Sequence, residues 1–203
     1  MKWTLKEVRK ETEHPFLNFY TLTYDVEDEN GHHDYSYFMA SRHDAESLLA
    51  KTGDTSRPDG VLIPLYYIDP KDGSISFMMT KQFRPAVGKY VTSMPAGLLD
   101  PEDNDLFTCV KREALEEAGA IVDDIEILCP AAPTSSGLSD ELDAVCLARI
   151  TGFAHNELEA FEDISSALKS REEVETMLQD PEHYFIPLNI RMILLYLLER
   201  FPK

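Results

Sequence analysis

The chain has 203 residues, enough for one domain with an elaboration or for two small lobes, and its 43% hydrophobic content can supply a full core. The formal net charge of −18 argues against a nucleic-acid backbone as a partner, because the field of the whole protein repels phosphates. An equal alternative is that this charge serves solubility and says nothing about partners.

The cysteines and the ends of the chain indicate a compartment. Cys109, Cys129 and Cys146 are odd in number and lack metal-ligand spacing, which favours buried reduced thiols in a reducing compartment. The N-terminus lacks an apolar signal core, and the longest apolar stretch, residues 192–198, is too short to span a bilayer. We therefore expect a cytoplasmic protein without a membrane partner.

The first part of the chain has the pattern of a small β-rich lobe. Apolar and polar residues alternate through 21–24 and 35–39, which predicts two antiparallel strands joined at Asn30-Gly31. Residues 44–51 have a helical composition that ends near Gly53. The polar segment that follows reads as a linker. We assign residues 1–57 to this N-terminal lobe.

Residues 58–203 form the second predicted domain, in which strands and helices are mixed. The patterns predict strands over residues 61–67, 74–80, 125–128 and 144–150, and helices over residues 106–118, 171–179 and 188–200. Pro181 and Pro187 separate the last two helices. This order implies an α+β or α/β/α layered fold.

An acidic face on the helix over 106–118 gives the strongest functional signal. At roughly 100° per residue, Glu113, Glu116 and Glu117 share one face, where like charges repel unless a cation lies between them. Carboxylate oxygens suit a hard divalent cation such as magnesium. The alternative is a solvated helix that carries an Arg112–Glu116 ion pair and ends at Gly119.

The segment before this helix supplies further oxygen atoms. Residues 94–100 form an apolar strand end that Pro95 and Gly97 interrupt, so a tight loop can turn backbone carbonyls toward the helix. Together, Gly97, Asp103 and residues 112–119 resemble the Nudix box of the Nudix hydrolases. Residues 82–90 with Pro95-Ala96-Gly97 are similar to the branch that hydrolyses ADP-ribose and nucleotide sugars.

The sequence also departs from the family pattern. Eight residues separate Asp103 from Arg112, one more than in the box, and an aspartate replaces the usual glutamate, so the register could instead fall on Asn104. Ser93 replaces a glutamate, and residues 135–137 lack a proline that this branch carries. These departures weaken the identity of the substrate more than the chemistry.

The resemblance implies a fold and a set of metal ligands. The fold is a Nudix-like α/β/α sandwich with a mixed sheet, accompanied by a small N-terminal antiparallel sheet. The expected ligands of Mg²⁺, with Mn²⁺ as the alternative, are Glu113, Glu117, Glu116 and the carbonyl of Ala96. Arg112 would orient a glutamate through bidentate hydrogen bonds.

Other site residues follow from the same resemblance. The base would come from the acidic loop over 156–163, with Glu162 favoured over Glu159, although each could simply be a solvated acid. Arg84 would contact a substrate phosphate and Leu98 the substrate, with a surface ion pair and core packing as the alternatives. Glu141, beside Asp140, would contact substrate or act as the base. Candidates for an aromatic platform under adenine are Trp3, Phe19, Tyr20, Tyr24 and Tyr35, although core or strand-face packing is the better interpretation for any one of them.

These expectations lead to one favoured activity and one alternative. The favoured activity is metal-dependent hydrolysis of the pyrophosphate bond of ADP-ribose or a related nucleoside diphosphate sugar, giving a nucleoside monophosphate and a sugar phosphate. The alternative is a catalytically inactive Nudix-like module that senses nucleotides, suggested by the altered spacing after Asp103 and by Ser93 and Ser136. The resemblance also suggests a homodimer in which the N-terminal lobe reaches the site of the partner.

Overall fold

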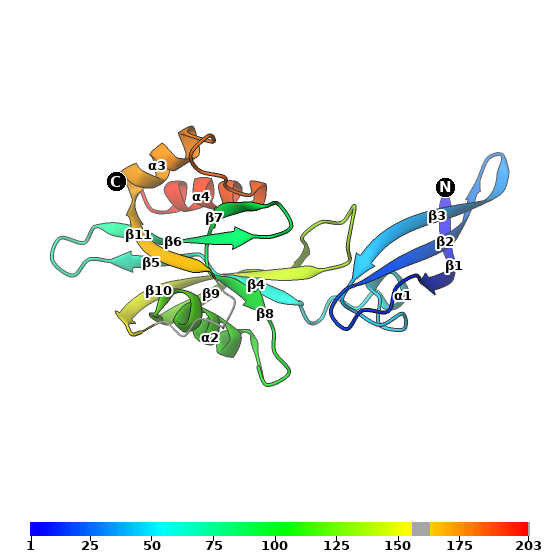
Figure 1. Cartoon of the computed structure of the whole chain (residues 1–203), viewed down its shortest axis with the longest axis horizontal. Helices are drawn as coiled ribbons and strands as arrows, with labels where there is room; N and C mark the ends of the chain where they lie inside the picture. Colours follow the sequence, from blue (N-terminus) through cyan, green and yellow to red (C-terminus); the bar gives the residue numbers. More distant parts are fainter. Residues whose placement is uncertain (156–162, 203) are drawn as a thin grey trace. The chain divides into compact units, whose positions relative to one another are not determined.

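The computed structural model describes residues 1–155 and 163–202 and divides the chain into two compact units (Figure 1). Unit 1 comprises Met1–Asp59 and Ala131–Asp143, and unit 2 comprises Gly60–Pro130 and Ala144–Lys203. Residues 131–143 group with unit 1, although the predicted boundary at residue 58 places them in the second domain. Each unit has hydrophobic clusters of its own and is described by itself.

Unit 1 is built on a three-stranded antiparallel sheet in the order β1-β2-β3. Its strands are β1 (Lys2–Lys10), β2 (Asn18–Asp28) and β3 (Gly31–Ser41). The predicted hairpin is confirmed: Asp28 pairs with Gly31, whose φ of 113° is accessible because glycine lacks a Cβ atom. Tyr20, Leu22, Met39 and Leu48 form the buried centre of the unit.

The helix expected over residues 44–51 is only partly present. Helix α1 covers Leu49–Thr52 and ends at Gly53, which has the left-handed conformation typical of a helix C-cap. The residues before it form a turn in which the amide of Ser47 donates to the carbonyl of Asp44 at 2.9 Å. The prediction was too long because turn and helix share the same polar composition.

Unit 2 contains an eight-stranded mixed sheet in the order β11-β6-β5-β10-β4-β8, with β7 beside β6 and β9 beside β10. β10 runs parallel to β5, whereas β6 is antiparallel to β5, β7 and β11. The bounds are β4 (Gly60–Leu62), β5 (Leu65–Ile68), β6 (Ile75–Arg84), β7 (Lys89–Ser93), β8 (Ala96–Leu98), β9 (Ala120–Pro133), β10 (Leu142–Phe153) and β11 (Ile164–Ser170).

The single strand predicted over residues 61–67 is wrong, because the chain breaks between β4 and β5. Pro64 has no N–H to donate to a sheet ladder. Its carbonyl accepts from Ala148 of β10 at 3.0 Å, while the amide of Ile63 donates to Pro95 at 2.8 Å. The break lets the chain leave the pairing with β8 and join β5 to β10.

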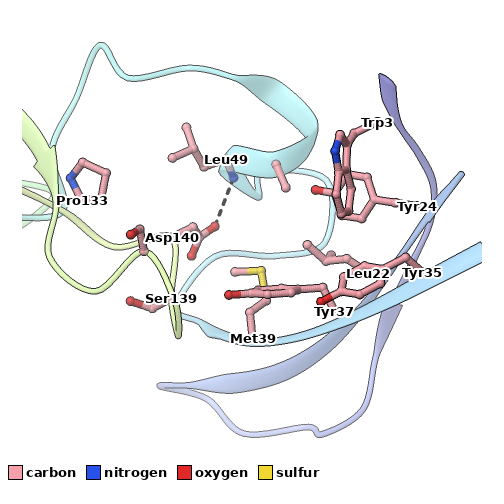
Figure 2. Close-up of a pocket in the computed structure, with 12 residues that line it drawn as sticks. Trp3, Leu22, Tyr24, Tyr35, Tyr37, Met39, Leu49, Pro133, Ser139 and Asp140 are labelled. Carbon is pink, nitrogen blue, oxygen red and sulfur yellow. Dashed lines mark hydrogen bonds between the residues drawn. The ribbon is translucent and has the colours of Figure 1, made fainter. Parts of the chain in front are cut away.

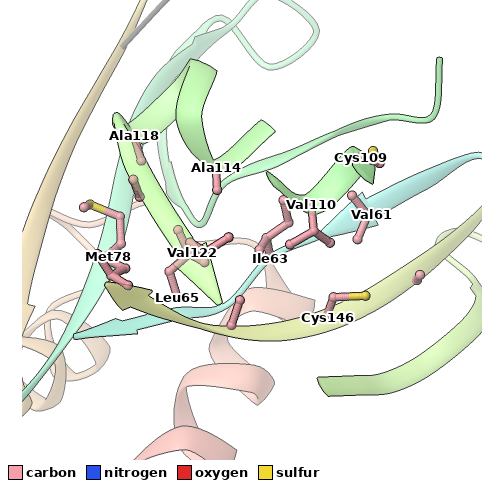
Figure 3. Close-up of a cluster of buried hydrophobic side chains, with 14 residues drawn as sticks. Val61, Ile63, Leu65, Met78, Cys109, Val110, Ala114, Ala118, Val122 and Cys146 are labelled. Carbon is pink, nitrogen blue, oxygen red and sulfur yellow. The ribbon is translucent and has the colours of Figure 1, made fainter. Parts of the chain in front are cut away.

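Three helices cover the faces of the unit 2 sheet, with α2 on one side and α3 and α4 on the other (Figure 1). They span α2 (Leu106–Ala118), α3 (Arg171–Gln179) and α4 (Leu188–Arg200), as the sequence patterns predict. Figure 3 shows Val110 and Ala114 of α2 in one buried cluster with Ile63 and Leu65. The predicted α/β/α sandwich with a mixed sheet is confirmed. Among the described residues, no helix is both long and apolar enough to cross a membrane.

Candidate active site

Helix α2 turns two of its glutamates inward. Only 8% of Glu113 and 6% of Glu117 are exposed to solvent, although both are carboxylic acids. They lie four residues apart, so they follow each other along one face of the helix. Glu116 lies beside this face and keeps 34% of its side chain exposed. Asp105 caps the N-terminus of the helix by accepting the amide hydrogen of Thr108, and this cap helps to fix where the glutamates fall.

The two buried carboxylates converge on consecutive residues of β8. The amide of Ala96 donates to Oε2 of Glu117 at 3.1 Å. A Cβ atom added to Gly97 would overlap the carboxylate of Glu113. Glycine at this position therefore allows the acidic group to lie directly against the strand backbone.

Arg112 connects the helix to the loop that precedes it. Its Nη1 donates to Oε1 of Glu113 at 2.7 Å and to Oε2 of Glu116 at 3.1 Å. Its Nη2 donates to Oδ2 of Asp103 at 2.7 Å and to the carbonyl of Leu98 at 3.0 Å. One guanidinium thus holds acidic groups of two segments in fixed positions, which a point charge such as that of lysine could not do equally well.

The partner of Arg112 in the loop is Asp103 and not Asn104. Asp103 is 6% exposed and also accepts the amide hydrogen of Asp100 at 2.9 Å, whereas Asn104 is exposed. Hydrogen bonds from Arg112 hold the pKa of the Asp103 carboxyl below its usual range. The extra residue of the loop is therefore accommodated without loss of the acid–guanidinium pair.

A thiol also lies against this network. Cys109 is fully buried, and its Sγ lies 3.6 Å from Nη2 of Arg112. Burial raises the pKa of the Cys109 thiol to about 12, so it is neutral at physiological pH and acts as a packing group.

The oxygen donors at this site fit a hard divalent cation in type and charge. Asp103, Glu113 and Glu116 contact one guanidinium, Glu117 lies on the same helix against Ala96, and Mg²⁺ prefers carboxylate oxygen. Within residues 1–155 and 163–202, no group of three or more His, Cys, Asp or Glu side chains is placed to bind a metal together. The metal-ligand roles of the three glutamates and of the Ala96 carbonyl stay predictions.

The remaining predicted site residues fall in different places. Leu98 ends β8 at 36% exposure, and its carbonyl accepts from Arg112. Glu141 belongs to unit 1, where its carboxylate accepts from Nε of Arg42 at 3.0 Å. Glu159 and Glu162 lie outside the described residues, so the assignment of the base stays a prediction.

Arg84 belongs to a cationic hairpin formed by β6 and β7, which the sequence patterns do not predict. Arg84 ends β6 and pairs in register with Lys89 of β7, and Lys81 lies over the ring of Tyr90 at 5.4 Å. Residues 80–93 contain no aspartate or glutamate in a chain of net charge −18. The hairpin register brings Arg84 beside Lys89, a pair of cations suited to phosphate, while the hydroxyl of Tyr90 donates to the carboxylate of Asp163.

The predicted adenine platform separates into different environments within unit 1. Tyr20 is fully buried, and its hydroxyl donates to the carbonyl of His43 at 2.8 Å. Phe19 stacks with Phe38 at a ring separation of 6.2 Å. Trp3 contacts both Tyr24 and Tyr35 through T-shaped packing. Only these last three residues of the predicted set gather around one cavity.

Comparisons with known proteins identify the family and the fold. The family model described as NUDIX domain matches residues 56–183. A segment of 59 residues is 37% identical to an uncharacterized Nudix hydrolase of Schizosaccharomyces pombe, and the match covers 29% of this chain and 28% of that protein. The crystal structure of an ADP compounds hydrolase is similar in fold, with a TM-score of 0.64 and 15% identity over 98% of this chain and 94% of that chain.

The close approach of Glu113 to Gly97 leads to a prediction about metal binding. In Gly97→Ala, the new methyl group displaces the Glu113 carboxylate, so we expect Mn²⁺ affinity to fall about tenfold. The obstructing atoms are the end of a flexible side chain, so the free energy of unfolding should change by less than about 1 kcal/mol. Titration calorimetry with Mn²⁺ and a denaturant melt measure the two effects. Gly137→Ala is the matched control, because a Cβ atom there meets no neighbour within 4 Å; unchanged affinity in Gly97→Ala would remove Glu113 from the ligand set.

The Asp103–Arg112 pair predicts a pH-dependent contribution to stability. The folded pKa of Asp103 is depressed, so its stabilisation is present above the unfolded pKa of about 3.9 and is lost as pH falls through the lower folded value. Asp103→Asn should cost about 1–2 kcal/mol at neutral pH, and the deficit should shrink toward about pH 3. Denaturant melts of metal-free protein across this range test the prediction. Asp123→Asn, an exposed acid in the same unit, serves as the control, and a deficit independent of pH would contradict the assignment.

Proposed function

This chain belongs to the NUDIX domain family, and on that premise we propose that it hydrolyses the pyrophosphate bond of ADP-ribose or a related nucleoside diphosphate sugar. One water molecule is consumed, and the products are a nucleoside monophosphate and a sugar phosphate. The observation that carries the proposal is the pair of nearly buried carboxylates, Glu113 and Glu117, over the backbone of β8.

Burial of this much negative charge favours a dication. Taking a carboxylate out of water costs several kcal/mol unless an opposite charge compensates. The single positive charge of Arg112 contacts the carboxylates of Asp100, Asp103, Glu113 and Glu116, so acidic groups outnumber it at this site. Mg²⁺, or Mn²⁺ in its place, would be held by Glu113, Glu116, Glu117 and the Ala96 carbonyl and would neutralise charge on the diphosphate.

Residues around the proposed metal site would orient its ligands and bind the substrate. Arg112 fixes the orientation of Glu113 and Glu116, because its two Nη atoms are committed to different segments. Arg84 and its neighbour Lys89 offer paired positive charges to the substrate phosphates. The exposed part of Leu98 would pack against the substrate.

The proton of the attacking water requires a base. We assign it to Glu162, with Glu159 as the second choice, and we assign substrate contact to Glu141. The carboxylates of all three can accept a proton or a hydrogen bond. The base assignment rests on the resemblance of the acidic loop over 156–163 to that of related pyrophosphatases.

The preference for ADP-ribose and related compounds has two supports. Residues 82–90 and 95–97 resemble the branch that acts on ADP-ribose and nucleotide sugars. The fold is also similar to that of an ADP compounds hydrolase, at 15% sequence identity. We extend the proposal to a cytoplasmic homodimer whose partner is a small nucleotide, without a nucleic-acid or membrane partner.

An inactive nucleotide sensor is the competing function, and its main motivation is weakened. The altered spacing after Asp103 suggested a damaged site. Asp103 nevertheless makes the 2.7 Å contact with Arg112, and Arg112 contacts two of the glutamates. The acidic and basic groups of the box lie together despite the longer loop, which favours an enzyme.

A substrate panel tests the reaction and its specificity together. With Mg²⁺, we expect ADP-ribose or another nucleoside diphosphate sugar to give a monophosphate and a sugar phosphate, detected by anion-exchange chromatography. Nucleoside triphosphates and dinucleoside polyphosphates belong in the same panel. Tight nucleotide binding by calorimetry with no product from any compound would refute the enzyme and favour the sensor.

Replacement of a buried carboxylate tests the site itself. Glu117→Gln keeps an oxygen that can accept from Ala96 but loses the charge, so we expect turnover to fall by at least about 100-fold. The free energy of unfolding should change by less than about 1 kcal/mol. Glu199→Gln on α4 removes an exposed carboxylate and should leave turnover unchanged. Full activity in Glu117→Gln would contradict the proposed site.

A further inference from the structure

We propose that the aromatic cavity of unit 1 binds a small organic cation with N-alkyl groups, such as a quaternary ammonium ion. The cavity has a volume of about 540 Å³ and lies between the sheet, α1 and the segment over 133–140 (Figure 2). This volume is within the range of small-molecule sites. The proposal is independent of pyrophosphate hydrolysis.

Four aromatic rings line the cavity. Trp3 meets Tyr24 at a ring separation of 5.8 Å and Tyr35 at 5.3 Å, both with T-shaped geometry. Tyr37 is held by a 2.9 Å hydrogen bond from its hydroxyl to the carbonyl of Gly137. Each ring thus contacts another ring or the backbone, Trp3 and Tyr35 are partly exposed to solvent, and the faces of aromatic rings attract cations.

Asp140 gives the cavity its charge. Only 9% of Asp140 is exposed, and its Oδ2 accepts the amide hydrogen of Leu49 at 3.1 Å (Figure 2). It is the one charged residue among those that line the cavity, and it forms no salt bridge within the part of the chain that the structure describes. A nearly buried carboxylate without a cationic partner loses solvation energy, and a bound cation would offset that loss.

The aromatic rings and the Asp140 carboxylate together select the class of ligand. An anion would be opposed by Asp140 and by the net charge of −18. A neutral aromatic ligand would gain from the rings but would leave the carboxylate without an opposite charge. A small inorganic ion such as Na⁺ gains little from the apolar lining. An alkylated ammonium ion satisfies both the rings and the carboxylate.

Trp3 is the only tryptophan of the chain, so its fluorescence reports on this cavity directly. The full-length protein is titrated with tetramethylammonium and with choline, while NaCl keeps the ionic strength constant. We expect a saturable change in Trp3 emission with both cations. The neutral isostere of choline, in which carbon replaces the nitrogen, should bind at least about tenfold more weakly. Equal binding of the isostere, or no saturable response to either cation, would overturn the proposal.

Two pairs of variants separate charge from shape. Asp140→Asn can still accept from Leu49 but lacks the charge, and we expect about tenfold weaker binding. Glu29→Gln, which removes an exposed charge from the turn before β3, should bind like the parent. Tyr35→Leu should weaken binding, whereas Tyr35→Phe keeps the ring and should preserve it. Circular dichroism verifies the fold, and the Tyr35 pair decides the outcome if Asp140→Asn does not fold.

In a final titration, adenosine monophosphate is added to the protein with tetramethylammonium bound. This nucleotide is chosen because Trp3, Tyr24 and Tyr35 are also candidates for an adenine platform. The proposal predicts that it does not displace tetramethylammonium. If the nucleotide saturates the Trp3 signal and competes with the cation, the cavity is a nucleobase site and the proposal fails.

Discussion

The structure of the candidate site depends on the ion pair between Arg112 and Asp103. Arg112 contacts the carboxylates of Asp103, Glu113 and Glu116 and places one positive charge between them. Without Arg112, these three carboxylates would lie close together without that charge. Their repulsion, together with the cost of burial, would favour separation of the loop from the helix. Because the guanidinium is planar and has five donors, it can bond both segments at once and still reach the Leu98 carbonyl. This contact therefore helps to hold α2 and its preceding loop beside β8.

A second constraint is the absence of a side chain at Gly97. The Glu113 carboxylate lies where any Cβ atom would be, so the close approach of helix and strand depends on one missing methyl group. The apolar cluster beneath α2, which includes Val110 and Ala114, supports the helix at that distance. Packing and the geometry of the candidate site are thus coupled, because the residues that bury the helix also determine how near its glutamates come to the backbone of β8.

Charge is distributed unevenly over a strongly acidic chain. The hairpin over 80–93 carries Lys81, Arg84 and Lys89 and has no acidic residue of its own, although its Tyr90 donates to the carboxylate of Asp163. Its paired cations offer an anionic substrate a favourable contact despite the overall charge of −18. The cavity of unit 1 has the opposite local charge, because Asp140, whose carboxylate accepts from the Leu49 amide, is the one charged residue among those that line it. The proposed phosphate site and the proposed cation site therefore differ in the sign of their local charge, and the two ligand classes would not compete for one surface.

The sequence by itself determined the helices α2, α3 and α4, the β2–β3 hairpin and the acidic face of α2, because periodicity, capping residues and turn residues act over a few neighbouring positions. Tertiary structure alone decided β1, β7, β8 and β11, since strand pairing joins residues far apart in the chain. It also broke the strand at Pro64, selected Asp103 over Asn104 as the partner of Arg112, and grouped residues 131–143 with unit 1. Local patterns specify which groups a segment offers, but contact across the fold decides which of them meet.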